Sequence, residues 1–296
     1  MGRIITVNKD FEKLYGITKR EYYSKQYLTF EALEDGTISF NIWYSMGTDY
    51  ITSISYSVDD GKTWVKTENT DNKEENLVID VDVKRGDKIL WKGEATQTGF
   101  YDSGEGDAVG SFFSSDCEFN VYGNIMSLLY EDDFRNKTSI NNIDYIFTCL
   151  FSDYYEENSC EVVSAEYFVL PALELTEHCY ESMFSSCNAL VNTPELPATT
   201  LAEYCYTSMF YGCTSLTTAP ELPATILTPS CYQTMLRSCI NLNYIKMLAT
   251  DISAEYCLYD WASLVAEEGT FVKNKNATWT TTGANGVPTG WTVETV

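Results

Sequence analysis

The stretch LAEYCYTSMFYGCTSLTTAP, which spans residues 201–220, decides the fold because its pattern recurs along the chain. Two series of cysteines recur at a constant step of 26: Cys179, Cys205, Cys231 and Cys257, and Cys187, Cys213 and Cys239. Self-similarity at a period of about 20 to 50 residues is typical of a solenoid. We therefore predict that residues 143–265 form a solenoid of 26-residue units, with these cysteines in its core.

Other fixed positions of the unit are also apolar, which extends the predicted core. They are occupied by Phe184, Phe210, Leu190, Leu216 and Leu242. Residues 143–170 form a first, degenerate unit, because a terminal repeat caps the stack and packs on one side only. The Gly- and Thr-rich end, residues 266–296, is predicted to close the last repeat as a β-hairpin cap.

The front of the chain follows a different pattern. Short alternating runs between residues 27 and 125 are separated by turn segments such as Asp59–Lys62 and Lys84–Asp87. Short strands without helical periods indicate an antiparallel β-sandwich. Residues 1–26 are predicted to be an arm that precedes the sandwich, and residues 126–142 a connector that follows it. The expected fold class is therefore mixed and β-rich.

The net charge of the chain argues against some classes of binding partner. The chain carries a net charge of −24, which argues against nucleic-acid binding because the phosphate backbone is repelled. No apolar run is long enough to span a membrane, and the start has no signal-peptide hydrophobic region. Residues 138–265 hold fifteen acids and two cations, whereas residues 1–25 hold six cations and three acids. We expect this basic arm to dock on an acidic partner, with a solvated tail as the alternative.

The repeated unit resembles the BspA-type (Treponema-type) leucine-rich repeat. That family has an aromatic-x-x-Cys-x-x-Leu core, which Phe210, Cys213 and Leu216 match, although the unit here is longer than the family's usual one. The resemblance covers residues 143–265. The Leu-Pro-Ala-Thr-Thr segment, residues 196–200, is a second departure from the family and is similar to segments of surface proteins from gut Bacteroidales and their phages. It implies a curved leucine-rich-repeat solenoid used for adhesion or for protein and glycan binding. It implies no catalytic residues.

Ten cysteines admit three interpretations. Buried thiols are favoured, because free cysteine packs as a small hydrophobic residue. Disulfides between stacked units come second, since neighbouring units lie close enough for bonding. A metal site comes last, because the Cys-x7-Cys spacing differs from the Cys-x2-Cys of structural zinc. We predict no cofactor.

Residues that could suggest chemistry are better explained without it. His178, the single histidine, aligns with Tyr204, Ser230 and Tyr256 at steps of 26, so its position is a variable one of the repeat. We predict no catalytic residue. Asp102, Glu105 and Asp107 are weak calcium candidates, and a solvated acidic loop is the favoured interpretation.

Tyrosines outside the fixed positions are the candidate binding surface. Tyrosine gives a large contact area at low entropic cost. The candidates are Tyr154, Tyr155, Tyr211 and Tyr259.

The expected function is non-enzymatic binding to a protein or glycan on a surface. We expect a phage virion appendage (a capsid decoration, a head fibre or a tail protein) on the virion surface, whose basic arm contacts other virion proteins. The alternative is a secreted BspA-like adhesin on the bacterial cell surface. A third class, an accessory module of a glycan-active enzyme, fits less well because no acid and base pair stands out.

Overall fold

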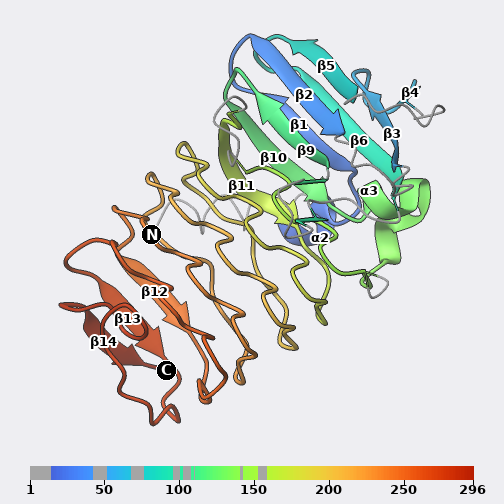
Figure 1. The fold of residues 1–296 in the computed structure, drawn as a ribbon. Coiled ribbons are helices and arrows are strands. Elements are labelled where there is room, and N and C mark those ends of the chain that lie inside the picture. The colour runs from blue at the N-terminus through green and yellow to red at the C-terminus, as the bar shows by residue number, and fades with distance from the viewer. Residues whose placement is uncertain are drawn as a thin grey trace.

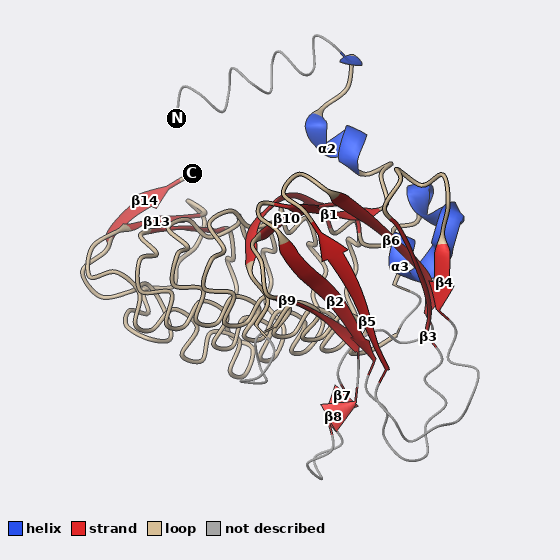
Figure 2. Ribbon diagram, turned by 90° about the horizontal axis from the view of Figure 1, so that it is seen from above, coloured by secondary structure: helices blue, strands red, loops and turns tan. Residues whose placement is uncertain are grey.

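The computed structural model describes residues 15–42, 52–67, 77–95, 101–102, 108–109, 111–140, 143–152 and 159–296. Two packed sheets form the front of the molecule, and a row of coils leads from them to a small sheet at the other end (Figures 1 and 2). A short helix, α2 (Lys19–Tyr23), precedes the first strand and is capped by the Thr18 side chain.

Within the described ranges, the front contains a six-stranded sheet, a three-stranded sheet and a short two-stranded ribbon. The order in the large sheet is β11-β10-β1-β6-β3-β4, and in the smaller one β5-β2-β9. The strands are β1 (Leu28–Ala32), β2 (Gly36–Ile42), β3 (Thr52–Ser57), β4 (Val65–Thr67), β5 (Leu77–Val83), β6 (Lys88–Ala95), β7 (Tyr101–Asp102), β8 (Ala108–Val109), β9 (Ser111–Ser115), β10 (Phe119–Asn124) and β11 (Val162–Val169).

Aromatic side chains fill the space between the two larger front sheets. Phe30 of β1 meets Phe113 of β9 with ring centroids 4.7 Å apart, and Trp91 of β6 lies 5.1 Å from Phe113. The alternating sequence of β5 explains how such faces arise, because successive side chains of a strand point to opposite sides. Ile79 and Val81 are buried there, whereas Asp80 between them is exposed.

The predicted connector packs tightly against the front sheets. It contains α3 (Ser127–Tyr130) and the 3-10 helix η1 (Glu131–Asn136), and the side chains of Leu128 and Phe134 are buried. Lys92 Nζ of β6 binds Asp132 Oδ1 at 2.8 Å, and the Tyr27 hydroxyl donates to the same oxygen at 2.6 Å. This segment therefore belongs to the front core.

Consecutive repeats are joined by backbone hydrogen bonds that use every second residue. The N–H of Tyr180 donates to the carbonyl of Cys205 at 3.0 Å, and that of Tyr206 to the carbonyl of Cys231 at 3.1 Å. The N–H of the residue in between donates to a carbonyl three residues earlier in the same repeat. Met183, for example, donates to the carbonyl of Tyr180 at 3.4 Å. Alternation satisfies the backbone without a regular strand. We call the described residues of 143–265 the repeat stack.

A left-handed backbone conformation at every fourth residue produces these turns. One repeat has it at His178, Ser182 and Ser186, with φ of 55°, 52° and 63°. The two following repeats have it at Tyr204, Ser208, Gly212, Ser230, Thr234 and Ser238. Such φ values cost roughly 1–2 kcal/mol for each residue with a side chain, so packing inside the stack must offset them.

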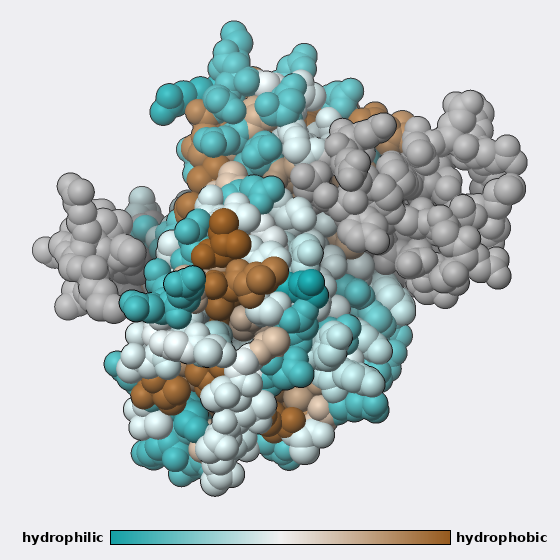
Figure 3. Space-filling model, turned by 60° about the vertical axis from the view of Figure 1, so that its left-hand side comes forward, coloured by the Kyte–Doolittle hydropathy of each residue, from teal (hydrophilic) through white to brown (hydrophobic). Residues whose placement is uncertain are grey.

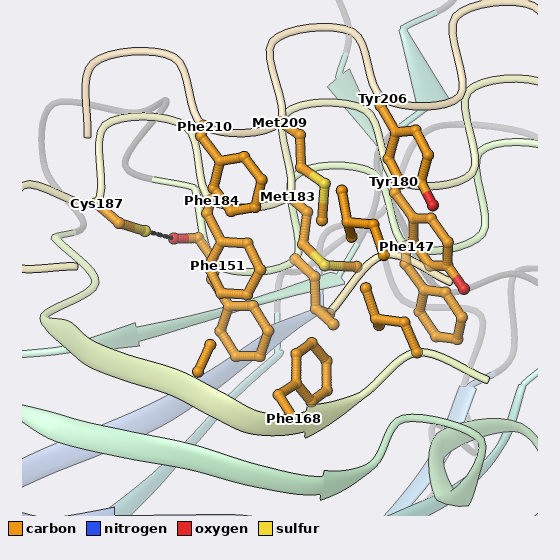
Figure 4. Close-up of a cluster of buried hydrophobic side chains, with 14 of the residues drawn as sticks. Phe147, Phe151, Phe168, Tyr180, Met183, Phe184, Cys187, Tyr206, Met209 and Phe210 are labelled. Atoms are coloured by element: carbon orange, nitrogen blue, oxygen red, sulfur yellow. Dashed lines mark hydrogen bonds between the residues drawn. The ribbon is translucent and has the colours of Figure 1, made fainter. Parts of the chain in front are cut away.

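Identical side-chain positions form columns inside the stack. Figure 4 shows Phe151, Phe184 and Phe210 lying one above another, with Met183 and Met209 beside them. Ring centroids in the phenylalanine column are 5.1 and 5.7 Å apart, and the rings are nearly parallel. Burying each such ring contributes about 1.5–3 kcal/mol.

The predicted fold class is wrong. The described structure is β-rich with several separate sheets, and none of these sheets forms a solenoid or a barrel. A leucine-rich repeat has a strand in each unit, but residues 170–243 contain only isolated bridges. The physical reason is the left-handed residue at every fourth position, together with prolines such as Pro197 and Pro223, which cannot donate to a ladder.

Both ends of that prediction also need correction. The front is not purely antiparallel, because β11 pairs in parallel with β10. The C-terminal segment is not a hairpin, since β12 (Tyr244–Met247), β13 (Thr270–Lys273) and β14 (Thr292–Thr295) form a parallel sheet. β11 lies within residues 143–265, the range predicted for the repeats, although it is the edge strand of the large front sheet. The predicted domain boundaries stay predictions.

Two buried hydroxyl groups in the stack make a testable feature. Within the described part of the chain, the Tyr180 and Tyr206 hydroxyls have no hydrogen-bond partner, and the same column holds Phe147 in the first repeat, 5.9 Å from Tyr180. Burying an unsatisfied polar group costs about 1–3 kcal/mol. We expect Tyr206→Phe to raise the free energy of unfolding by about 1 kcal/mol, measured by urea denaturation.

Phe184→Leu is the matched control in the neighbouring column. It should lower the free energy of unfolding by about 1–2 kcal/mol, because leucine fills less of the buried space that the phenylalanine ring occupies in the column. A loss of stability in Tyr206→Phe would contradict the interpretation, since it would mean that the hydroxyl has a stabilising partner.

Candidate functional site

The predicted repeat-core residues all lie inside the stack. Seven of them are the cysteines at the two fixed positions, and each is at most 3 % exposed. The others, Phe184, Phe210, Leu190, Leu216 and Leu242, are fully buried. These side chains are therefore out of reach of a partner, and a functional surface has to be sought elsewhere on the stack.

One cysteine column makes regular sulfur hydrogen bonds between repeats. Each thiol donates to the carbonyl of the aromatic residue in the preceding repeat: Cys187 to Phe151 at 3.0 Å, Cys213 to Phe184 at 3.1 Å and Cys239 to Phe210 at 3.0 Å. Figure 4 draws the first of these bonds. Only a protonated thiol can donate here, so this column uses cysteine in its reduced form.

The thiols are expected to react slowly in the folded protein. All ten cysteines are reduced and buried. Burial raises the pKa of Cys179 and of Cys231 to about 12, and it raises the pKa of Cys205 well above its ordinary value. Thiolate is the nucleophile and the metal ligand, so these groups are poor at both tasks. No cluster of metal-ligating side chains occurs among the described residues.

His178 stands between two tyrosines on the outside of the stack. Its ring centroid is 4.2 Å from that of Tyr145 and 4.5 Å from that of Tyr204, with nearly parallel planes. Its Nδ1 contacts the Glu181 carboxylate. Within the described ranges no hydroxyl or thiol hydrogen-bonds to the ring, so the geometry supports stacking.

The turn face is the outer surface formed by the left-handed residues and the residue before each of them. Tyr211 lies on it half-buried, and Tyr259 lies on it 48 % exposed. Tyr259 packs edge-on against Tyr256, which aligns with His178 three steps earlier. Two of the four candidate tyrosines thus lie on the same face as the stacked rings of Tyr145, His178 and Tyr204. These two tyrosines are two repeats apart from each other.

Other predicted site residues are not placed together. Tyr154, Tyr155, Glu105 and Asp107 lie outside the described residues, and Asp102 ends the short strand β7. Large exposed apolar residues are scattered over different columns. On the face that Figure 3 presents, hydrophobic areas are small and separated by hydrophilic ones, so that face offers no broad apolar patch.

The described part of the basic arm folds back on the chain. Arg20 of α2 forms an ion pair with Glu195, and Lys19 Nζ donates to the Tyr167 hydroxyl at 2.8 Å. Tyr23 stacks on Tyr167 with ring centroids 4.9 Å apart. These side chains contact β11 and the repeats, whereas residues 1–14, the rest of the arm, lie outside the described residues.

A hollow beside α2, which we call the α2 groove, is a feature that sequence reasoning missed. It measures about 280 Å³ and lies between residues 18–20, the end of β11 and the segments 193–195 and 220–221. Its charged lining residues are Lys19, Arg20, Glu166, Glu195 and Glu221. The paired Pro-Glu steps at 194–195 and 220–221 are one repeat apart, but nothing in the sequence indicated that α2 would lie against them.

Comparison with known proteins identifies no relative. No family model matches the chain, and neither the curated proteins nor the solved structures contain a match. The resemblance to BspA-type repeats therefore stays a prediction. None of the helices in the described residues has the length and apolar character needed to cross a membrane.

The state of the thiols can be counted directly. We expect all ten to react with Ellman's reagent after denaturation, and none to react rapidly in the native protein, because all are buried. A count well below ten in denaturant would contradict the reduced-thiol structure and point to disulfides.

Alkaline pH should destabilise the protein. An unfolded thiol ionises near pH 9, whereas the pKa of Cys179, of Cys231 and of Cys239 is about 12 in the folded protein. The unfolded state then binds fewer protons, so stability is full below pH 9 and falls as pH rises toward 12.

Each thiol lowers stability by up to about 1.4 kcal/mol per pH unit in that window. Urea midpoints between pH 7 and pH 11 measure the effect, with Cys239→Ala as a variant that has one titrating thiol fewer. A midpoint that does not change above pH 9 would contradict the assignment.

Proposed function

We propose that this protein is a non-enzymatic surface binding protein. It presents the turn face and the α2 groove on a stack held rigid by backbone hydrogen bonds between repeats. Binding residues are effective when they sit on a rigid scaffold, because less entropy is lost on association. The regular outer surface of the stack is the observation that carries this proposal.

We place the protein on a phage virion, as a capsid decoration, a head fibre or a tail protein. The thiols support this setting. Ten reduced, buried cysteines suit a chain that folds in a reducing compartment, because disulfides form and persist in oxidising ones. A virion protein folds inside its host cell before release, which meets that condition.

A secreted adhesin on a bacterial surface is the second candidate. The resemblance of the repeats to BspA-type units favours it, and buried thiols with raised pKa values would also resist oxidation outside the cell. The two settings share the same binding surfaces. They differ in whether a phage particle or a bacterial cell displays the protein.

Enzymatic activity on a glycan is not supported by the arrangement of the groups. The α2 groove contains three carboxylates, but Glu195 is engaged by Arg20, and Glu221 by Lys246 at 2.8 Å. A glycosidase uses two carboxyl groups that flank the scissile bond as acid and base or nucleophile. Two of the three carboxylates in this groove are instead occupied by cations.

Location is the test that separates the two settings. We expect mass spectrometry of purified phage particles to find this chain in constant stoichiometry with the capsid or tail proteins. Recovery from the surface of bacterial cells free of phage would contradict the virion setting. In either setting, the purified chain should bind intact Bacteroidales cells, and failure to bind any host surface would contradict the binding function.

A further inference from the structure

We propose that the α2 groove binds a neutral polyhydroxylated ligand, a sugar residue of a glycan. This inference rests on the proposed binding function and names its ligand class and its place. The groove lies where the front sheets, α2 and the repeats meet, and its volume is about 280 Å³. A concave site of that size suits one or two sugar rings.

The groove opens because the inter-repeat ladder stops there. Ala165 of β11 donates to the carbonyl of Asn192 at 2.8 Å. Among the described residues, no later residue of β11 makes a backbone hydrogen bond to the repeats. Among the described residues, no backbone hydrogen bond joins 192–197 to 218–223. Thr193 and Glu195 line the groove, and their peptide groups have no backbone partner among the described residues. Such groups need a partner or water.

The charges of the lining point to a neutral ligand. Two cations and three carboxylates line the groove, and Lys246 binds Glu221 from outside the lining. An anionic ligand would need an excess of cations, and a cationic one would have to displace Arg20 from Glu195. A sugar hydroxyl donates and accepts at once, so it can bridge a carboxylate oxygen and a guanidinium or ammonium N–H without breaking their pairing.

An added peptide strand is the less suitable occupant. Strand addition needs a continuous row of backbone donors and acceptors along one edge. Pro194 and Pro197 interrupt that row on one wall, and Pro220 does so on the other, because proline has no N–H. Sugar hydroxyls need only single donors and acceptors at suitable positions, and the groove provides these.

The test is isothermal titration of the full-length chain with maltotriose, cellotriose and mannotriose, and with trilysine and inorganic phosphate as charged probes. Glu166→Gln and Thr193→Val alter the groove without touching either of the ion pairs at its rim. Glu294→Gln, which alters an exposed carboxylate of β14 outside both the groove and the turn face, is the matched control. Unfolding temperatures of all variants establish that each is folded.

We expect at least one trisaccharide to bind and neither charged probe to compete. Glu166→Gln should weaken binding about tenfold or more, the usual effect of losing a hydrogen bond to a charged group, and Glu294→Gln should leave it unchanged. Equal affinities in all variants, binding of a charged probe alone, or no trisaccharide binding would each overturn the inference. Adhesion of the chain to host cells in any of these cases would leave the proposed function standing and place its ligand elsewhere.

Discussion

Alternating backbone hydrogen bonds are the constraint on which the rest of the structure depends. Along the turns of each repeat, for example residues 178–187, every second N–H reaches the next repeat and the N–H between closes a turn, so this part of the stack satisfies its backbone without strands. The pattern needs a left-handed residue at every fourth position. That requirement is strained for most side chains, and the strain is tolerable only because the columns inside are fully buried.

This constraint explains why cysteine recurs. The carbonyls of Phe184 and Phe210 already accept the N–H three residues on, and they have a second lone pair inside the protein. A thiol of the next repeat takes it at 3.1 Å for Phe184 and 3.0 Å for Phe210. Serine could donate as well, but it would bring a more polar group into an apolar interior, whereas cysteine packs there as a small hydrophobic residue.

The sequence predicted which residues align, and it did not predict the path of the backbone between them. A step of 26 aligns Cys205 with Cys179 and Phe210 with Phe184 in the sequence, and the rings of Phe184 and Phe210 lie 5.7 Å apart in the structure. The left-handed turns were not predicted, because most of them carry residues that rarely adopt that conformation, such as Ser182, Tyr204 and Thr234. β11 was missed for another reason: its apolar run fits a repeat equally well, and only tertiary contact with β10 decides its place.

The α2 groove was beyond sequence reasoning because four segments that are separate in the sequence build it. Its position follows from the junction itself. The first repeat packs its interior against the front sheets, with Phe113 of β9 donating to Leu150 at 2.8 Å, so one hydrophobic core runs through both parts. β11 stays paired with β10 to its last residue. On its other edge it bonds to residues 191 and 192 near its start and makes no later backbone bond to the repeats among the described residues, so the sheet and the stack diverge along that edge. The place where the two geometries diverge is therefore the place where backbone groups remain available to a ligand.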